Sequence, residues 1–338
     1  MAGPRQGDAP VIEICQFGAG RIGRVHAANI AAHPGARLRY VVDVDNAAAA
    51  ALAAAHGAEA TDAESALADP DVSAIVIASS TDTHVGFIEA GARAGKAIFC
   101  EKPIHLDLRR VDACLSVLDE CNASIFVGFN RRFDPSFAAL KSAVREGQIG
   151  RVEMVSITSR DPAPPPIDYI KVSGGLFRDM MIHDFDMARW LLDEEPAEVF
   201  ATGSCLVDPA IGAAGDIDTA LVTLKAESGA LCQISNSRRA VYGYDQRIEV
   251  LGARGMLRAE NRLPTSVEHA TADGIRTDPP LHFFLERYEE AYKRELASFL
   301  DAVAGGKIFS PGGEDGRAAQ ALAEAAVTSF ESGNTVRV

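Results

Sequence analysis

Asp179 and His183 lie four residues apart in an apolar stretch that follows the Gly174-Gly175 break. Residues at i and i+4 share one face of an α-helix, and we expect a helix over residues 179–192, so both side chains should project together. A histidine beside a carboxylate can accept a proton near neutral pH, as the oxidation of an alcohol requires. The spacing therefore predicts a base at His183 supported by Asp179.

A lysine is the second candidate for chemistry. Glu101-Lys102-Pro103 follows a predicted strand over residues 97–100. Ligands bind at the carboxyl edge of an open parallel sheet, where an ammonium group could hydrogen-bond a substrate oxygen and stabilise alkoxide character. Taken alone, the tripeptide would also suit a surface turn.

A dinucleotide-binding motif precedes both candidates. Gly18-x-Gly20-x-x-Gly23 follows a predicted strand over residues 11–17 and opens a predicted helix over 24–32. Gly18 allows the tight turn, Gly20 leaves room for a pyrophosphate at the helix N-terminus, and Gly23 permits close packing. This context predicts a dinucleotide site.

An acidic residue at the end of the next strand predicts which dinucleotide binds. Asp43 lies twenty residues beyond Gly23 and could accept hydrogen bonds from a ribose diol, while it would repel a 2′-phosphate. NAD is therefore favoured over NADP, and Asp45 is a weaker candidate for the same role. The stretch 79–84 could contact the cofactor or equally cap the next helix. The residues expected to bind NAD are Gly18, Gly20, Arg21, Ile22, Gly23, Asp43, Ser79, Thr81, His84, Glu101 and Lys102.

These residues need a scaffold of two domains. Predicted strands at 38–42, 74–78, 97–100 and 124–128 alternate with helices, which indicates a doubly wound parallel α/β sheet of the Rossmann type over residues 1–130. Beyond it, longer strand-like stretches with the one helix over 179–192 indicate an α+β domain, residues 131–338, with a large open, mostly antiparallel sheet. The expected strands of this domain lie at 151–160, 197–207, 216–225, 229–239 and 245–251. Two terminal helices, at about 282–304 and 314–331, could pack back on the first domain.

The composition excludes several classes of function. The 338 residues are 47% hydrophobic and carry a formal net charge of -14 without a long basic run, so we expect neither a nucleic-acid nor a membrane partner. The first ten residues lack the apolar core of a signal peptide. The six cysteines are scattered without metal-ligand spacing, so we expect buried, reduced thiols, no metal site and a soluble cytoplasmic protein.

Together these motifs closely resemble the Gfo/Idh/MocA family of NAD(P)-dependent oxidoreductases. The resemblance runs from Val11 to the C-terminal helices and rests on the glycine motif, Glu101-Lys102-Pro103 and Asp179-x-x-x-His183-x-x-Asp186. It implies a catalytic triad of Lys102, Asp179 and His183. His183 would take the proton from a ring hydroxyl while the hydride passes to nicotinamide C4. Lys102 would bind the reacting oxygen, Asp179 a neighbouring hydroxyl, and Asp186 would support the histidine or cap a contact at the domain interface.

Within the family, the stretches 128–134, 159–166 and 235–245 resemble members that act on inositol. The expected reaction is the oxidation of a cyclic polyol, foremost myo-inositol to 2-keto-myo-inositol (scyllo-inosose). The residues expected to bind the polyol are Lys102, Asn130, Arg131, Asp161, Asp179, His183 and Tyr244.

Several of these assignments have alternatives. Asn130 could contact the nicotinamide, and Arg131 or Arg132 could pair with Asp134. Only one of Tyr242 and Tyr244, which alternate along a strand-like segment, can face the pocket.

Other activities remain open at this point. The substrate could be another inositol isomer or a pyranose, and the enzyme could be an NAD-dependent glycosidase-type hydrolase that forms no net NADH. A non-enzymatic NAD-binding regulator would be expected to have a damaged triad, whereas this triad is intact. The open sheet needs cover, and the resemblance implies a homo-oligomer, a dimer or tetramer, that pairs through this sheet.

Overall fold

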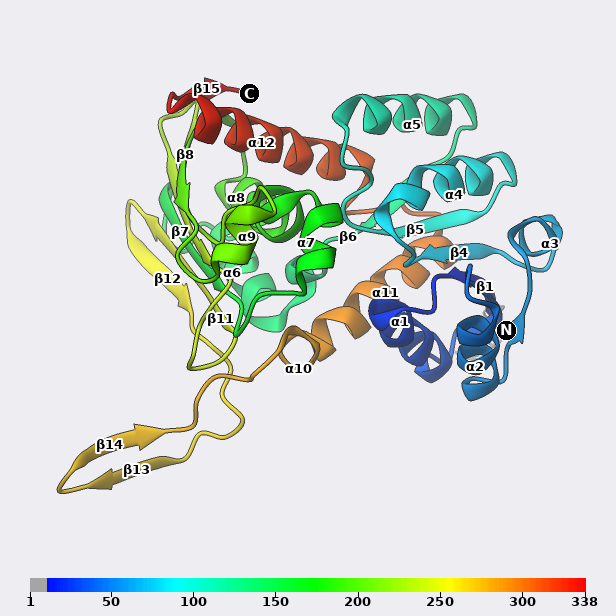
Figure 1. Cartoon of the computed structure of the whole chain (residues 1–338), viewed down its shortest axis with the longest axis horizontal. Coiled ribbons are helices and arrows are strands. Elements are labelled where there is room, and N and C mark those ends of the chain that lie inside the picture. The colour runs from blue at the N-terminus through cyan, green and yellow to red at the C-terminus, as the bar shows by residue number, and fades with distance from the viewer. Residues whose placement is uncertain (1–10) are drawn as a thin grey trace, which may run out of the picture. The chain divides into compact units, whose positions relative to one another are not determined.

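The computed structural model describes residues 11–338, which form two compact units (Figure 1). Unit 1 holds the described chain up to Asn130 together with Tyr292–Arg317, and unit 2 holds Arg131–Ala291 and Ala318–Val338. The later boundaries fall inside helices α11 (Glu289–Gly305) and α12 (Gly313–Ser332). Residues 292–317 therefore belong to unit 1, although they lie between the two segments of unit 2 in the sequence.

Unit 1 contains a six-stranded parallel sheet in the order β3-β2-β1-β4-β5-β6. Its central strands are buried on both faces, which is why they are nearly continuous apolar runs; every residue of β4 is buried. The predicted doubly wound α/β fold is confirmed. The strands are β1 (Ile12–Phe17), β2 (Ala36–Val42), β3 (Glu59–Ala60), β4 (Ala74–Ile77), β5 (Ala97–Glu101) and β6 (Ile125–Gly128).

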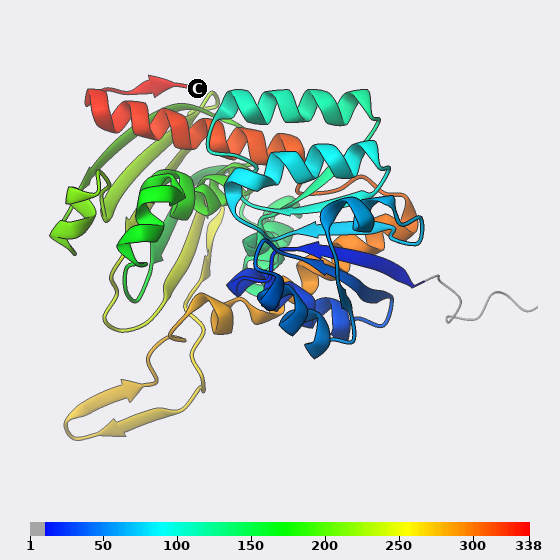
Figure 2. The ribbon, with the colours of Figure 1, turned by 45° about the vertical axis from the view of Figure 1, so that its right-hand side comes forward.

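Helices cover both faces of this sheet. Helices α4 and α5 lie side by side on one face (Figure 2). On the other face, α11 packs through Phe299 against Phe99 and Phe126, with ring centroids 5.7 and 5.8 Å apart. The helices between the strands are α1 (Arg21–Ala32), α2 (Asn46–Ala55), α3 (Ala63–Ala68), α4 (Thr81–Arg93) and α5 (Leu108–Glu120).

Unit 2 contains a seven-stranded sheet in the order β12-β11-β7-β10-β9-β8-β15. All neighbours pair antiparallel except β10 and β7, so the predicted α+β domain with a mostly antiparallel sheet is confirmed. Helices α6 (Pro135–Arg145) and α8 (Ile182–Leu192) contact this sheet. The strands are β7 (Val152–Arg160), β8 (Pro196–Ser204), β9 (Thr219–Ala226), β10 (Leu231–Ser237), β11 (Asp245–Gly252), β12 (Gly255–Ala259) and β15 (Val336–Arg337).

The expectation of one regular helix over residues 179–192 is wrong. The chain first forms a π-helical turn, Leu176–Met180, and α8 follows it. The Met181 N–H donates to the Leu176 carbonyl five residues back at 2.9 Å, the spacing of a π turn. Gly174 and Gly175, at φ of +89° and +83°, separate this turn from α7 (Ile167–Ser173). Such turns are frequent at functional sites.

Other elements were not expected from the sequence. The 3-10 turn Asn130–Phe133, α6, α7 and α9 (Pro209–Ala213) add helical structure to the region where one helix was expected. The expected helix over 282–304 is split into α10 (Phe284–Arg287) and α11. A hairpin of β13 (Glu268–Thr271) and β14 (Gly274–Thr277) extends away from the sheet of unit 2 (Figure 1), and all of its strand residues are exposed. Among the described residues, no helix has both the length and the hydropathy to cross a bilayer.

Candidate active site

The glycine loop between β1 and α1 is packed too tightly for side chains. Gly18 has a φ of +104°, and a Cβ there would lie 2.4 Å from the Ala78 carbonyl oxygen. A Cβ on Gly23 would lie 2.2 Å from the Gly18 carbonyl oxygen. The buried Gln16 amide donates to the carbonyls of Gly18 and Gly23, both at 2.8 Å, and so connects the two ends of the loop. Both glycines are therefore needed for backbone reasons.

The loop leaves space where a pyrophosphate would lie. Apart from its two neighbours in the chain, nothing lies within 4 Å of a Cβ built on Gly20, and no side chain caps α1, whose first residues are Arg21 and Ile22. Unsatisfied amides at a helix N-terminus attract phosphate groups. The Asp43 carboxylate lies beside this space, because its Oδ2 accepts the Ala19 N–H at 2.6 Å. The residues present therefore fit NAD, with the phosphates on α1 and the adenosine ribose at Asp43.

Asp45, the weaker ribose candidate, is the N-cap of α2. Its Oδ1 accepts the N–H groups of Ala47 and Ala48 at 2.9 and 3.1 Å. Its own N–H donates to Asp43 Oδ1 at 2.8 Å. The structure therefore gives Asp45 a capping role that Asp43 does not have.

His84 connects two loops at the carboxyl edge of the sheet. Its Nδ1 lies 2.9 Å from the Pro103 carbonyl oxygen and its Nε2 lies 3.1 Å from that of Ser79. Burial lowers the pKa of His84 below its usual value, so the ring is neutral near pH 7. Ser79 and Thr83 share a hydrogen bond of 2.7 Å, and Thr81 begins α4 after an N-cap, Ser80, whose side chain does not cap. Contacts from these residues to NAD stay predictions.

Glu101-Lys102-Pro103 ends β5 and is not a surface turn. Glu101 and Pro103 are buried and Lys102 is half-buried. The Lys102–Pro103 peptide bond is cis. Glu101 Oε1 lies 2.7 Å from Nε2 of His26, a fully buried residue of α1. The lysine therefore sits on a backbone that is anchored to the helix of the glycine loop.

In unit 2, Asp179 lies in the π turn and His183 lies in the first turn of α8, and both are half-buried. The Tyr169 hydroxyl donates to Asp179 Oδ1 at 2.9 Å. Asp161 follows β7 and interacts electrostatically with Asp179. Burial raises the pKa of Asp161 to about 6, although the Arg238 cation lowers it. The structure thus groups two predicted substrate ligands, Asp161 and Asp179, in one unit with His183.

Arg131 and Arg132 form buried ion pairs with residues of α8. Arg131 Nη1 donates to Asp184 Oδ1 at 2.5 Å, and Arg132 donates twice to Asp186 at 2.8 and 2.5 Å. The carboxylate of Asp134 instead pairs with Arg287, so the expected pairing of Asp134 with Arg131 or Arg132 is wrong. Asn130 is buried at the start of the 3-10 turn. Contacts from Asn130 and Arg131 to substrate stay predictions.

Tyr242 and Tyr244 lie in the turn before β11, so the expected strand-like alternation is wrong here. Tyr242 is 43% exposed and its hydroxyl donates to Asp245 at 2.6 Å. Tyr244 is buried, packs edge-on against Tyr288, and has Arg131 and Asp161 among its charged neighbours. Burial raises the pKa of Tyr244 well above its usual value, so its hydroxyl is a neutral donor. Of the two tyrosines, Tyr244 is therefore the one that lies near Asp161.

Arg238, which is buried beside Asp179 and Asp216, is not among the residues predicted from the sequence. Its Nη2 lies 3.8 Å from Asp179 Oδ2 and 3.6 Å from Asp216 Oδ2. The stretch 235–245 carries part of the family resemblance, but nothing in its sequence distinguishes the buried Arg238 from the exposed Arg239.

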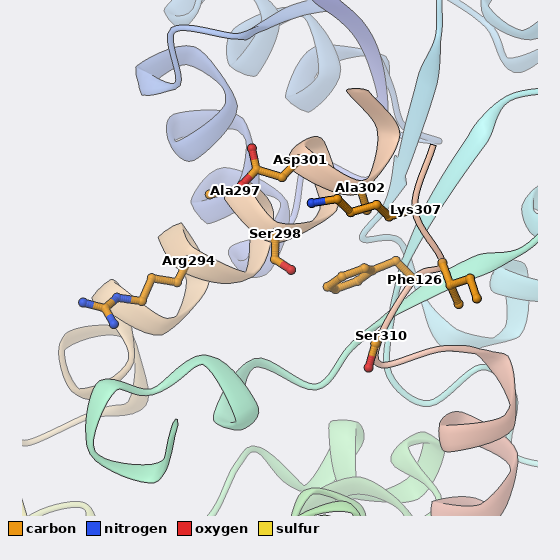
Figure 3. A pocket seen from close by; sticks show the side chains of 9 residues that line it. Phe126, Arg294, Ala297, Ser298, Asp301, Ala302, Lys307 and Ser310 are labelled. Atoms are coloured by element: carbon orange, nitrogen blue, oxygen red, sulfur yellow. The ribbon is translucent and has the colours of Figure 1, made fainter. Parts of the chain in front are cut away.

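A separate pocket of about 390 Å³ lies on unit 1 (Figure 3). Side chains of α11 and of residues 307–310 surround Phe126 there, and no predicted site residue is among those that line it. The lining residues are Phe126, Arg294, Ala297, Ser298, Asp301, Ala302, Lys307, Ile308 and Ser310.

Comparison with known proteins agrees with this geometry. The model of the oxidoreductase family with an NAD-binding Rossmann fold matches residues 12–129, and that of the GFO/IDH/MocA C-terminal domain matches residues 137–258. The chain belongs to the GFO/IDH/MocA family. This family member is an NAD-dependent oxidoreductase, and the geometry of its glycine loop and of Asp43 is compatible with that cofactor.

Relatives of this GFO/IDH/MocA protein match it over nearly its whole length. The inositol 2-dehydrogenase of Rhizobium meliloti (strain 1021) is 58% identical over 314 residues, which are 93% of this chain and 95% of that protein. The structure of a myo-inositol dehydrogenase from Corynebacterium glutamicum ATCC 13032 matches with a TM-score of 0.94 at 47% identity and covers 97% of this chain and 99% of its own. That of scyllo-inositol dehydrogenase from Lactobacillus casei, with bound NAD(H) and scyllo-inositol, matches with a TM-score of 0.90 at 30% identity over 97% of this chain and 99% of its own.

Proposed function

We propose that this enzyme oxidises a ring hydroxyl of a cyclic polyol to the ketone, and that myo-inositol, giving 2-keto-myo-inositol, is its foremost substrate. The observation that carries the proposal is the grouping of Asp161, Asp179 and Tyr244 in the unit that holds His183. A site that binds several hydroxyls needs donors and acceptors at fixed positions and rejects analogues that lack those hydroxyls. The relatives named for inositol support the same substrate class.

In this proposal the side chains divide the work of the reaction. His183 accepts the proton of the reacting hydroxyl, and Lys102 hydrogen-bonds the same oxygen and stabilises its developing negative charge. Asp179 accepts a hydrogen bond from a neighbouring hydroxyl and so orients the ring. NAD, when bound, supplies the hydride acceptor, so that alcohol and NAD⁺ become ketone, NADH and one proton. Lys102 belongs to unit 1 and the other two residues to unit 2, so their meeting is part of the proposal.

The first experiment follows absorbance at 340 nm with purified protein, NAD and myo-inositol at mildly alkaline pH, beside scyllo-inositol, D-chiro-inositol and glucose. Strong NADH formation with myo-inositol supports the proposal. NADH formation only with another compound would assign that compound instead. No NADH with any polyol, from protein that retains NAD through purification, would favour the glycosidase-type reaction.

Scyllo-inositol is the second candidate substrate, because one matching structure is a scyllo-inositol dehydrogenase with that compound bound. The two isomers differ in the orientation of one hydroxyl. The ratio of kcat/KM for the two compounds decides between them.

We also propose that the protein is a homo-oligomer that pairs through the open face of the sheet in unit 2. The strand registers align Leu231, Met154, Leu251 and Met256 as a continuous row across β10, β7, β11 and β12. These side chains are 37–45% exposed. An apolar row of this length on an uncovered sheet face is typical of a protein interface. A second copy would cover it, as the family resemblance implies.

We further propose a cytosolic location. All six cysteines are free thiols, four of them buried. Free thiols are expected in a reducing compartment.

A further inference from the structure

Arg238 is a permanently charged side chain in the interior of unit 2. It follows β10 directly, its N–H donates to the Asp218 carbonyl at 2.8 Å, and the residue is 1% exposed. A guanidinium does not lose its proton in proteins, so this charge stays buried at every working pH. Burial of an unpaired charge is unfavourable, so nearby carboxylates must compensate it.

Arg238 differs from the buried Arg131 and Arg132 in its distance to the carboxylates that compensate its charge. The buried Arg131 and Arg132 donate hydrogen bonds of 2.5–2.8 Å to carboxylates of α8. Arg238 instead lies 3.6 Å from Asp216 and 3.8 Å from Asp179, and its buried Nε and Nη2 atoms have no hydrogen-bond partner among the described residues. It supplies charge to these carboxylates without occupying their lone pairs.

Asp216 connects this charge to the turn that carries Asp179. Its Oδ1 accepts the N–H of Leu176, the first residue of the π turn, at 3.0 Å. A Cβ on Gly175 would lie 2.8 Å from the same oxygen, so the carboxylate is seated directly against the backbone. Arg238 therefore lies beside two carboxylates, that of Asp216, which accepts a backbone N–H of the π turn, and that of Asp179, which lies in the turn.

Asp161 is the third carboxylate within the field of Arg238. The charged and titratable groups around it are Arg238, Asp179, Arg131, Asp184 and Tyr244. Of the cations in this set, Arg238 has the largest effect on Asp161. The side chain of Asp161 has no hydrogen-bond partner within the described chain, so its oxygens remain available to a ligand.

We propose that Arg238 is a positioning residue whose buried charge stabilises the carboxylates of Asp161 and Asp179 through space, without itself occupying the oxygens that accept substrate hydroxyls. The assignment rests on the proposed function, because the hydroxyls are those of the polyol. A guanidinium in hydrogen-bond contact would compete with the substrate, whereas one near 3.8 Å stabilises the carboxylate through space.

The test compares Arg238→Met, Arg238→Lys and, as the matched control, Arg239→Met at the exposed neighbouring position. Initial rates with NAD and myo-inositol are measured from pH 5 to 10. We expect Arg238→Met to lower kcat/KM for myo-inositol by about 10²-fold, with KM for NAD unchanged. The acidic limb of its pH profile should rise by about one unit or more, because the carboxylates lose their cation. Arg238→Lys should leave the limb in place, and Arg239→Met should match the wild type. Folded Arg238→Met with a wild-type pH profile overturns the proposal.

Two further measurements keep the proposal testable if Arg238→Met does not fold or if the enzyme does not oxidise the polyols tested. If Arg238→Met does not fold, Arg238→Met/Asp216→Asn removes the cation with one of its carboxylates and should fold, still with a raised acidic limb.

The ¹³C resonance of the Asp161 carboxyl, identified by its absence from Asp161→Asn, reports ionisation without turnover. Its midpoint, which we expect near pH 6 in the wild type, should rise when Arg238 becomes Met. An unmoved midpoint overturns the role of Arg238 even in an active enzyme, whereas a raised midpoint in a protein that oxidises no polyol overturns only the proposed function.

Discussion

His26 Nε2 lies 2.7 Å from Glu101 Oε1, and this contact joins the helix after the glycine loop to the strand end that carries Lys102. Both residues are buried, and the His26 ring also packs edge-on against Phe99 and Tyr292. The glycine loop and Lys102, the lysine proposed to act in catalysis, are therefore held by one connection inside unit 1. A change at His26 should affect both.

We expect His26→Ala to lower the free energy of unfolding by about 2–4 kcal/mol, since it opens a cavity and leaves a buried carboxylate without its partner. Urea denaturation measures this change. His269→Ala, on the exposed hairpin strand β13, is the control and should leave stability unchanged. Equal stability of the two variants would show that the contact with Glu101 contributes nothing.

Asp43→Ala should weaken NAD binding and relax the discrimination against NADP, because the carboxylate beside the glycine loop is lost. Asp45→Ala is a matched comparison, as it removes the N-cap of α2 and should lower stability by about 1 kcal/mol without changing the cofactor ratio. The ratio of kcat/KM for NAD to that for NADP, measured in both variants, decides which of the two carboxylates selects the cofactor. A changed ratio in Asp45→Ala alone would assign the ribose to Asp45.

His183→Ala should reduce turnover by about 10²–10⁴-fold, because no other group is expected to accept the proton of the reacting hydroxyl. NAD affinity, measured by calorimetry or fluorescence titration, should persist. An active His183→Ala enzyme would disprove the proposed base.

Glu295 predicts a pH dependence of stability in unit 1. It is fully buried on α11, and neither carboxylate oxygen has a hydrogen-bond partner among the described residues. Burial and the neighbouring Glu101 raise the pKa of Glu295 well above its usual value, so the folded protein holds this proton more tightly than the unfolded chain. The stability from this proton is fully present below the unfolded pKa of about 4.5 and is lost as pH rises towards the folded pKa.

Glu295→Gln keeps the shape and cannot lose a proton. Relative to this variant, the wild type should lose up to about 1.4 kcal/mol of unfolding free energy per pH unit within that window. Urea titrations of both proteins between pH 5 and 8 measure the difference. Parallel curves over this range would mean that Glu295 has a pKa close to that of the unfolded chain.

Met154→Glu should separate the proposed oligomer, since it places a charge in the middle of the apolar row of unit 2. Light scattering coupled to size exclusion measures the mass. Val241→Glu makes the same type of change at an exposed site outside the sheet and should not alter it. A wild-type protein of monomeric mass would rule out the pairing.

Much of unit 1 could be predicted because its signals are local. Strands buried on both faces are short apolar runs, and helices between them follow a regular spacing. The roles of Gly18 and Gly23 follow from backbone geometry that only glycine tolerates, so the motif predicts the loop directly. The end of β2 places Asp43 beside that loop, because neighbouring parallel strands end at the same edge.

Unit 2 was harder to predict because its decisive contacts are long-range. Periodicity indicated the strands and a helix around His183, but it could not reveal the π turn, whose first N–H donates to Asp216, forty residues away from Leu176. The pairing of Asp134 with Arg287, 153 residues further along, is equally invisible in the local sequence.

The sequence by itself thus determined the dinucleotide loop, the sheet class of each unit and the residue types available for proton transfer, since these depend on local backbone limits and hydrophobic spacing. The tertiary structure alone decided which buried charges meet: Arg131 with Asp184, Arg132 with Asp186, and Arg238 between Asp179 and Asp216. Adjacent arginines such as Arg238 and Arg239 have the same chemistry in the sequence. Only the packing of elements distant in the chain buries one of them and leaves the other in solvent.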